Sequence, residues 1–241
     1  MKYYYDLHIH SALSPCGDNE STPASIAGMA KLNGLGLVAL TDHNTCKNCP
    51  AFFEAARQLG ILPVAGMELT TAEDIHAVCL FPTLEKALEF EKELDGHKIL
   101  FPNRVDIFGN QYIMDCEDNV VGEEEYLLSN ATDVGLEQLP EMVEKYGGIC
   151  YPAHIDRPSN SVTAVLGCFP TYMNFCCAEL HKGAAVDDYL TDTGLKEEKL
   201  LICSDAHYLW DIKDACEYLE LPEIPDGADN AGEYLINYLR G

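Results

Sequence analysis

Short apolar segments with β-strand character alternate with longer segments of helical periodicity along most of the chain. Seven of the apolar segments predict strands, at residues 3–10, 35–41, 62–68, 75–81, 148–153, 175–180 and 200–204. Five segments between them predict helices, at residues 22–33, 50–59, 84–94, 136–146 and 184–193. Strands that alternate with helices are typical of βα units and a parallel sheet. Seven such strands favour an α/β barrel over a short open sheet.

One long segment interrupts this alternation. Residues 97–135 lie between the fourth and fifth predicted strands and contain Pro102, Gly109, Asn110 and an acidic run at 123–125. A connection of this length between strands is commonly a functional element. We therefore expect a single domain over residues 1–241, with 97–135 as an insertion or lid within it.

The composition is that of a globular chain with one large core. Apolar residues make up 47% of the 241 positions, and the mean hydropathy is -0.09. No apolar run approaches the ~20 residues that span a bilayer, and the N-terminus lacks the features of a signal peptide. These observations predict a cytoplasmic location and no membrane partner. The eleven cysteines are then expected to be free thiols.

The formal net charge of -25 is large. It argues against an extended nucleic-acid surface, because such a surface needs clustered Lys and Arg to displace counterions. It does not exclude a phosphorylated substrate, because bound divalent cations would dominate the field in a site. A phosphorylated small molecule or a nucleotide is therefore compatible with the acidic charge as a partner.

Two histidines stand two residues apart in the first predicted strand. In a strand, residues two apart point to the same side, so His8 and His10 present two imidazoles on one face. Imidazole is a ligand for zinc, iron and manganese among other metals. The alternative is a half-buried strand with two hydrogen-bonded core histidines. Asp205 and His207 repeat the same alternation after the last predicted strand.

Further polar side chains follow the other apolar segments. The ends of buried parallel strands are where α/β folds place ligands and catalytic groups. Nine residues are candidate metal ligands, namely His8, His10, Asp18, His43, Glu68, His76, His154, Asp205 and His207. A structural zinc needs only four ligands and usually several thiolates. Nine nitrogen and oxygen ligands therefore indicate two or three hydrolytic metal ions, although His76 alone would be interpreted as a core histidine.

These motifs resemble those of the PHP (polymerase and histidinol phosphatase) family. The segments that carry the resemblance are Asp6-Leu7-His8-Ile9-His10-Ser11, Thr41-Asp42-His43, Gly66-Met67-Glu68, the later His76 and His154, and Ser204-Asp205-Ala206-His207. The resemblance implies a distorted (β/α)7 barrel and a di- or trinuclear site that hydrolyses phosphoesters with metal-activated water. The implied cofactors are two to three divalent ions of zinc, manganese or iron.

By position, the resemblance also implies three ligand sets. They are His8, His10, Glu68 and Asp205; Glu68, His76 and His154; and Asp18, His43 and His207. Family members commonly have Ser-Asp-Gly after the first motif, whereas this chain has Ser14-Pro15-Cys16-Gly17-Asp18. The third set is therefore open between an acid and a histidine, and Asp18 is our prediction for it.

Several residues receive more specific roles. We expect Glu68, Asp205 and His207 to be catalytic, Glu68 by bridging metals and His207 also by protonating a leaving oxygen. Arg157 carries a planar fork that suits phosphate, with a surface role as the alternative. Asp6 and Asp42 are expected either to orient imidazoles or to cap loops.

Three functions remain open at this stage. The leading one is a phosphoesterase that acts on a small molecule or nucleotide, the second a histidinol-phosphate phosphatase, and the third a non-catalytic metal-binding module. The third would be indicated by lost ligands, and the principal ligands are all present. The pair Cys46 and Cys49 is compatible with a redox switch or half a zinc site, but an incidental pair of core thiols is the simpler interpretation.

Overall fold

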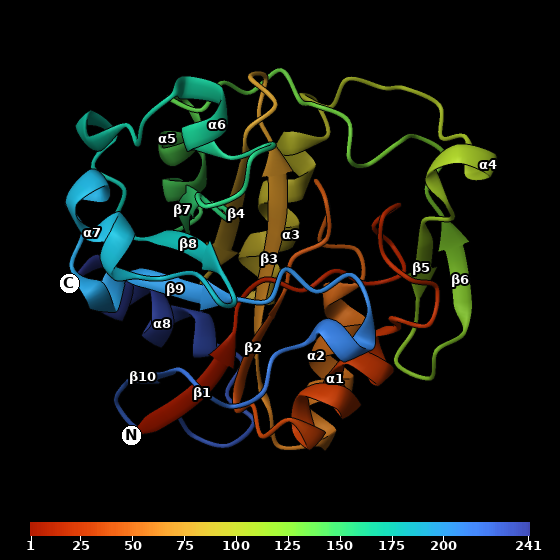
Figure 1. The fold of residues 1–241 in the computed structure, drawn as a ribbon. Helices are drawn as coiled ribbons and strands as arrows, with labels where there is room; N and C mark the ends of the chain where they lie inside the picture. The colour runs from red at the N-terminus through yellow and green to blue at the C-terminus, as the bar shows by residue number, and fades with distance from the viewer.

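The computed structural model describes residues 1–241 and has a curled, mixed β-sheet at its centre (Figure 1). Six strands form this sheet in the order β10-β1-β2-β3-β4-β7. Their bounds are β1 Lys2–Asp6, β2 Leu37–Leu40, β3 Leu62–Thr70, β4 His76–Phe81, β7 Ile149–Pro152 and β10 Tyr218–Glu220. A parallel pair, β8 (Ala178–His181) and β9 (Leu200–Cys203), lies beside it. Each of the seven predicted strands overlaps an observed one.

Hydrogen bonds outside the strands connect the pair to both sides of the main sheet. Ile155 N, just beyond β7, donates to Glu179 O in β8 at 2.8 Å. His10 N, beyond β1, donates to Ala206 O beyond β9 at 2.9 Å. The α/β class is therefore confirmed and the sheet curls as half a barrel does, whereas a (β/α)7 barrel with an inserted segment is not confirmed.

The predicted all-parallel arrangement is wrong at β4. This strand pairs antiparallel with β3 and with β7. Only five residues, 71–75, separate β3 from β4, whereas a parallel pairing needs a crossover of about a dozen residues or more. The short connection makes a hairpin, and it brings the first residue of β4 to the same end of the sheet as the last residues of β3.

Helices cover the sheet where the periodicity predicts them, and three more are present. The bounds are α1 Pro23–Leu32, α2 Cys49–Gln58, α3 Leu84–Leu94, α4 Val105–Phe108, α5 Leu139–Glu144, α6 Val162–Leu166, α7 Asp187–Thr193 and α8 Ala231–Arg240. Thr22 caps α1 by accepting from Ser25 N at 3.2 Å, as its position before Pro23 predicts. None of these helices has the length and apolar character needed to cross a membrane.

Both faces of the sheet are buried. Along β2, Val38 and Leu40 pack in the cluster that contains α1, α2 and α3, whereas Leu37 and Ala39 pack in a second cluster inside the curl. The C-terminal helix α8 contributes to this inner cluster. Its Arg240 donates to Gly148 O just before β7, so α8 lies at the end of the curl where β7 begins. Polar side chains gather at the opposite end.

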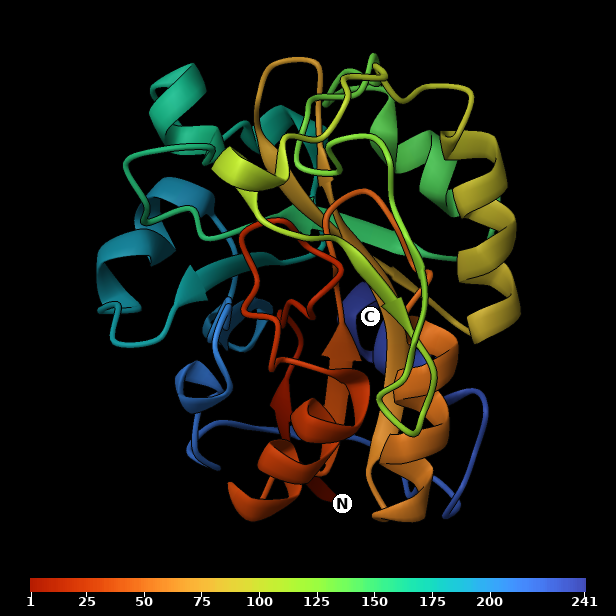
Figure 2. The same ribbon diagram turned by 90° about the vertical axis from the view of Figure 1, so that its right-hand side faces the viewer.

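The 97–135 segment contains α4 and the antiparallel hairpin of β5 (Tyr112–Met114) and β6 (Val120–Glu123). It packs beside α2 and the loop after β1, as Figure 2 shows from the side. Tyr112 N donates to Ala12 O at 2.8 Å, and Met114 N donates to Asn48 Oδ1 at 2.9 Å. Gly109 approaches Pro15 O so closely that a Cβ there would lie 2.8 Å from it. The segment therefore borders the loop that follows β1.

Candidate metal centre

A group of imidazoles and carboxylates lies at the carboxyl end of the curled sheet. Strand periodicity explains part of it, because residues two apart share a face. In β3, Leu62 and Val64 point into the curl, and Glu68 continues this alternation. In β4, Val78 and Leu80 point inward, and His76 has the same parity. Eight of the nine predicted ligands meet here, namely His8, His10, His43, Glu68, His76, His154, Asp205 and His207.

Glu68 is at the centre of the group and is 1% exposed. Its Oε1 lies 2.9 Å from His76 Nδ1, 3.0 Å from His154 Nε2 and 3.4 Å from His8 Nε2. Its Oε2 lies 3.2 Å from His43 Nδ1 and 3.3 Å from His10 Nε2. One carboxylate therefore faces five imidazoles from four separate segments, and each of its two oxygens is close to at least two of the rings.

The first implied ligand set is assembled in full. One ligand atom from each of His8, His10, Glu68 and Asp205 lies within 4.8 Å of the others. Asp205 Oδ1 is 3.1 Å from His10 Nε2 and 3.4 Å from His8 Nε2. All four side chains are buried.

The outer nitrogen of His8 is held by an acid that the sequence analysis did not single out. His8 Nδ1 lies 2.8 Å and 2.9 Å from the two carboxylate oxygens of Glu179, a fully buried residue in β8. A carboxylate can only accept, so Nδ1 carries the proton and Nε2 turns its lone pair to the cluster. The sequence did contain a signal for this contact. Glu179 lies inside an apolar run, and a buried Glu is rare unless it is paired.

A serine and an aspartate orient His10 in the same way. His10 Nδ1 lies 3.0 Å from Ser14 Oγ, and Ser14 Oγ donates to Asp42 Oδ1 at 2.7 Å. Because the serine proton is committed to Asp42, His10 Nδ1 is the donor to Ser14. Asp42 thus orients an imidazole through Ser14, as one of its two predicted roles requires. Asp6 does not touch an imidazole; it accepts from Ser204 N at 3.1 Å.

These hydrogen bonds leave two lone pairs facing each other. His8 Nε2 and His10 Nε2 are 3.1 Å apart, although both Nδ1 atoms are already donors. Two neutral imidazoles repel in this arrangement, and a cation or an additional proton beside them removes the repulsion. The donor set therefore fits a divalent metal ion.

Two further groups of ligand atoms lie next to the first. His43, Glu68 and His76 form one, and His10, Cys16, His43 and His207 form the other. His154, predicted with Glu68 and His76, also contacts Glu68.

Two residues of the cluster have a strained backbone. The φ of His154 is +30° and that of Asp205 is +48°, and backbone in this region costs of order 1–3 kcal/mol at a residue with a side chain. The fold maintains this strain where both residues turn toward the cluster.

Asp18 does not join any of these groups. Its carboxylate accepts from Glu20 N at 2.8 Å and so caps a local turn, whereas Cys16 occupies the position beside His10, His43 and His207. Cysteine within the divergent 14–18 motif was the signal for this difference. Cys46 and Cys49 are buried core thiols, with Cys46 Sγ 3.2 Å from Gly66 O.

The charges of the cluster shift the pKa values of its members in opposite directions. Burial opposes ionisation of Glu68, but the imidazoles of His76 and His8 lower its pKa well below the usual value. Burial likewise opposes protonation of His10, but hydrogen bonds to Asp205 and Glu68 raise its pKa to about 9. Without metal, protons on His8 and His10 therefore balance the carboxylates.

The remaining imidazoles behave differently. Burial, together with the positive charge of His10, lowers the pKa of His207 to about 4. Burial also lowers the pKa of His43 well below its usual value. Both rings are neutral near pH 7, and neutral imidazole is the form that binds metal.

A small cavity of about 80 Å³ opens over the cluster. Its wall has no hydrophobic residue and consists of His43, Glu68, His76, His154, Arg157, Ser159, Asn160, Asp205 and His207. Arg157 Nη1 lies 2.7 Å from Asp205 Oδ2, and the side chain is 36% exposed. The predicted phosphate contact therefore stands in the wall of the cavity, with part of its guanidinium open to solvent.

A model of the PHP domain matches residues 6–162 of the chain. The protein belongs to the PHP domain family. Among curated relatives, an uncharacterized protein of Methanocaldococcus jannaschii is 31% identical over 102 residues, which are 39% of this chain and 60% of that protein. A 5'-3' exoribonuclease of Haemophilus influenzae is 32% identical over 102 residues, 39% of this chain and 36% of that protein. The matches thus cover less than two thirds of these relatives.

Solved structures resemble this PHP-family chain over most of its length. An endonuclease Q in complex with a 27-mer duplex that carries an abasic lesion superposes with a TM-score of 0.64 at 19% identity, over 100% of this chain and 57% of that one. A candidate metal-dependent phosphoesterase of Bifidobacterium adolescentis superposes with a TM-score of 0.57 at 18% identity, over 84% of this chain and 87% of that one. At these identities the likeness shows the fold. The predicted class, a hydrolase of phosphoester bonds, is confirmed at the level of the PHP family, and an exoribonuclease is named among the relatives of this chain.

The endonuclease Q complex overturns one prediction. We expected no extended nucleic-acid surface because the net charge is -25, but a protein of this fold binds a DNA duplex. That expectation is wrong. Net charge sums over the whole molecule, whereas metal ions and nearby cationic groups determine the field at a phosphate-binding site.

Proposed function

We propose that this PHP-family protein is a metal-dependent phosphoesterase that acts on a phosphoester of a nucleotide or an oligonucleotide. The observation that carries the proposal is the Glu68 carboxylate at the centre of five imidazoles. Two to three divalent ions of zinc, manganese or iron are the proposed cofactors. Their proposed ligands are His8, His10, His43, Glu68, His76, His154, Asp205 and His207.

The chemistry divides between the metal ions and the chain. When bound, divalent ions supply Lewis acidity and an activated water for the attack on phosphorus. Glu179 and the Ser14–Asp42 pair hold His8 and His10 in the tautomers whose Nε2 atoms face the cluster. Because these rings are oriented before substrate arrives, no reorganisation is needed during the reaction.

Two residues of the cavity wall receive roles toward the substrate. Arg157 is proposed to contact a phosphoryl oxygen through the part of its guanidinium that does not pair with Asp205. His207 has two candidate roles, as ligand and as proton donor. Its Nδ1 lies 2.8 Å from Asp205 O, and burial lowers its pKa to about 4. We favour the ligand role, because a ring that is neutral at pH 7 has no proton to donate through Nε2.

The size of the cavity restricts what can enter it. A volume of about 80 Å³ is far below the ~300–1,000 Å³ of pockets that enclose a whole organic ligand. A polar wall and this volume suit the phosphoryl group alone, so the rest of the substrate must lie outside. This condition is met by a nucleotide or a nucleic-acid end.

Two exposed aromatic rings support a nucleotide. Tyr208 follows the cavity residue His207 directly, and its ring stacks on that of Trp210 with centroids 5.0 Å apart and planes 17° from parallel. The rings are exposed, Trp210 by 71%. Aromatic faces of this kind stack with bases of any sequence. We propose that a base adjoining the reacting phosphate rests on this pair.

Residues 1–241 are proposed to form one catalytic domain. Within it, the 97–135 segment is proposed to act as a lid over the cavity above the metal centre. Its contacts through Tyr112 and Gly109 are with Ala12 and Pro15, in the loop that carries Cys16. A movement of the segment would therefore be transmitted to the rim of the metal centre.

The experiment is a substrate comparison with metal-reconstituted protein. Hydrolysis is measured for bis-p-nitrophenyl phosphate, p-nitrophenyl phosphate, nucleoside monophosphates, short DNA and RNA strands and histidinol phosphate. We expect turnover of nucleotide or oligonucleotide phosphoesters that Glu68→Gln abolishes. The matched control is Glu85→Gln, an exposed position on α3, which should retain full activity. No turnover of any phosphoester with zinc, manganese or iron would overturn the proposal, and exclusive turnover of histidinol phosphate would replace it.

A further inference from the structure

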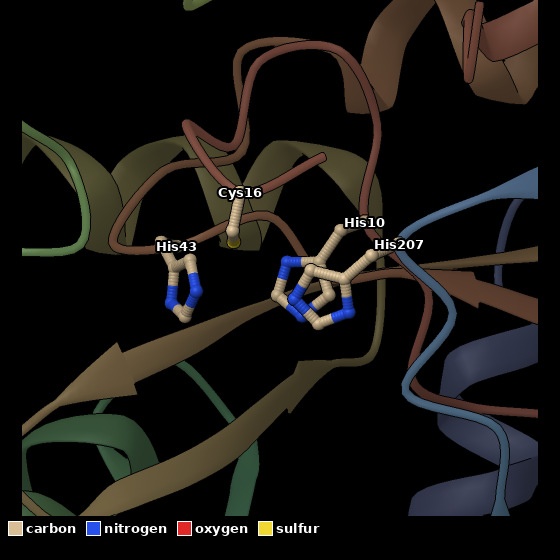
Figure 3. Close-up of side chains that lie close together, drawn as sticks. All are labelled: His10, Cys16, His43 and His207. Atoms are coloured by element: carbon tan, nitrogen blue, oxygen red, sulfur yellow. The ribbon is translucent and has the colours of Figure 1, made fainter. Parts of the chain in front are cut away.

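The thiol of Cys16 points into the space between three imidazoles. One ligand atom from each of His10, Cys16, His43 and His207 lies within 4.8 Å of the others. Figure 3 shows the sulfur facing His43 on one side and the neighbouring rings of His10 and His207 on the other. The rings of His10 and His207 stack with centroids 4.5 Å apart. The four side chains come from three distant parts of the chain.

Tight turns fix the backbone on both sides of Cys16. Gly17 N donates to Ser14 O at 2.9 Å, and Asp18 N donates to His207 O at 2.8 Å. At Gly17, a Cβ would lie 2.3 Å from Ser11 O, so only glycine permits this turn. The second of these hydrogen bonds ties the loop to a residue of the same group, so the thiol is held beside the histidines by the fold.

His43 provides a second, independent observation. It is 4% exposed, and its buried Nδ1 makes no hydrogen bond, although Glu68 Oε2 lies 3.2 Å from it. A buried polar atom without a partner is costly, and such atoms mark places where an ion belongs. His207 has its Nδ1 committed to Asp205 O, which leaves Nε2 for a ligand.

We propose that the Cys16 thiolate is a ligand of a zinc ion bound with His43 and His207, on the side of the cluster that His10 borders. The inference rests on the proposed metal centre and adds one sulfur ligand to it. Binding breaks the S–H bond, forms a sulfur–metal bond and releases the proton to solvent. Thiolate and imidazole together favour zinc over manganese. A sulfur ligand would therefore select zinc, whereas a site with only oxygen and nitrogen ligands accepts either metal.

The test uses cobalt as a spectroscopic substitute for zinc in the full chain. We expect Co²⁺ to produce a near-ultraviolet thiolate-to-cobalt charge-transfer band in the wild-type protein. Cys16→Ser should lose the band and one equivalent of tightly bound metal, while its circular dichroism spectrum is unchanged. The matched control is Cys168→Ser, which removes another exposed free thiol and should retain the band and the metal content.

The outcomes separate this inference from the proposed function. A Cys16→Ser protein that keeps both the band and its full metal content would overturn the sulfur ligand. Cobalt binding without the band in the wild type would also overturn it, and hydrolysis by that protein would leave the phosphoesterase proposal intact. A band without hydrolysis of any phosphoester would support the ligand and contradict the phosphoesterase. Failure to bind cobalt or zinc at all would overturn both.

Discussion

His8 Nδ1 lies 2.8 Å from Glu179 Oε1 in β8, and this contact directs the opposite nitrogen of the ring at Glu68 and Asp205. Glu179 also accepts from His154 N at 3.3 Å. One buried carboxylate therefore orients segments that follow two different strands. Glu179 belongs to none of the groups of ligand atoms. It acts on the metal centre by positioning His8 and His154.

The first prediction concerns this orientation. Glu179→Gln places an amide that can donate where His8 needs an acceptor, so the imidazole loses its preference for the productive tautomer. Metal affinity should fall about 10–100-fold, as measured by competition with a chromophoric chelator. Glu197→Gln, at an exposed position, is the control. An unchanged affinity in the Glu179 variant would show that the ring is oriented by other contacts.

A second prediction concerns Arg157. Arg157→Met removes the proposed phosphate contact, and a hydrogen bond to a charged group contributes about 1.5–3 kcal/mol. We expect kcat/KM to fall roughly ten- to hundred-fold, with the metal content unchanged. Steady-state kinetics and elemental analysis measure the two quantities. Loss of metal from the variant would instead mean that Arg157 serves mainly to position Asp205.

The third prediction is the pH dependence of stability without metal. The pKa of His10 is raised from about 6.5 to about 9, so its stabilising effect is complete below pH 6.5 and is lost as the pH rises to 9. The pKa of His207 is lowered to about 4, so stability from its neutral form is gained between pH 4 and 6.5. The melting temperature of metal-free protein should therefore be highest near pH 6.5.

Bound metal should stabilise the protein more strongly as the pH rises above 6.5. The proton on His10 must leave before its Nε2 can bind a metal, so metal binding is favoured as the pH rises from 6.5 to 9. The increase in melting temperature caused by zinc should grow over that interval in differential scanning fluorimetry. An increase that is independent of pH would contradict the assignment of His10 as a ligand.

The fourth prediction concerns the aromatic pair. Trp210 is the only tryptophan of the chain, so binding of a nucleotide should quench the intrinsic fluorescence. Tyr208→Ala should weaken nucleotide binding by about 1–3 kcal/mol per stacked base and leave the hydrolysis of glycerol phosphate unchanged. Equal losses for both substrates would indicate that Tyr208 supports His207 rather than a base.

The sequence predicted the parts of this site that follow regular strand geometry. Glu68 and His76 face the interior because β3 and β4 alternate to their ends, and the ligand types at strand ends were visible in the motifs. His154 could not be oriented by parity, because its φ of +30° re-aims the side chain after β7. The reversal of β4 was missed although the sequence carried its signal, because the residues between the predicted strands 62–68 and 75–81 are too few for a parallel crossover.

Other parts depend on contacts between segments that lie far apart in the chain. Glu179 joins His8 across 171 positions, and nothing local to β8 indicates that partner. Cys16 and Asp18 are both within the divergent loop, and the hydrogen bond from Asp18 N to His207 O belongs to the turn that sets the sulfur beside the histidines. The helix α8 has a clear apolar face that buries Leu235 and Leu239, yet its place at the far end of the curl requires the whole sheet.

The central claim is that Glu68 bridges metal ions among the imidazoles. Crystals of zinc-loaded protein, with data collected on both sides of the zinc absorption edge, test it most directly. We predict two or three anomalous peaks in the cluster, with the two carboxylate oxygens of Glu68 each about 2.0–2.2 Å from a peak. A map without anomalous density between Glu68, His8 and Asp205 would contradict the account.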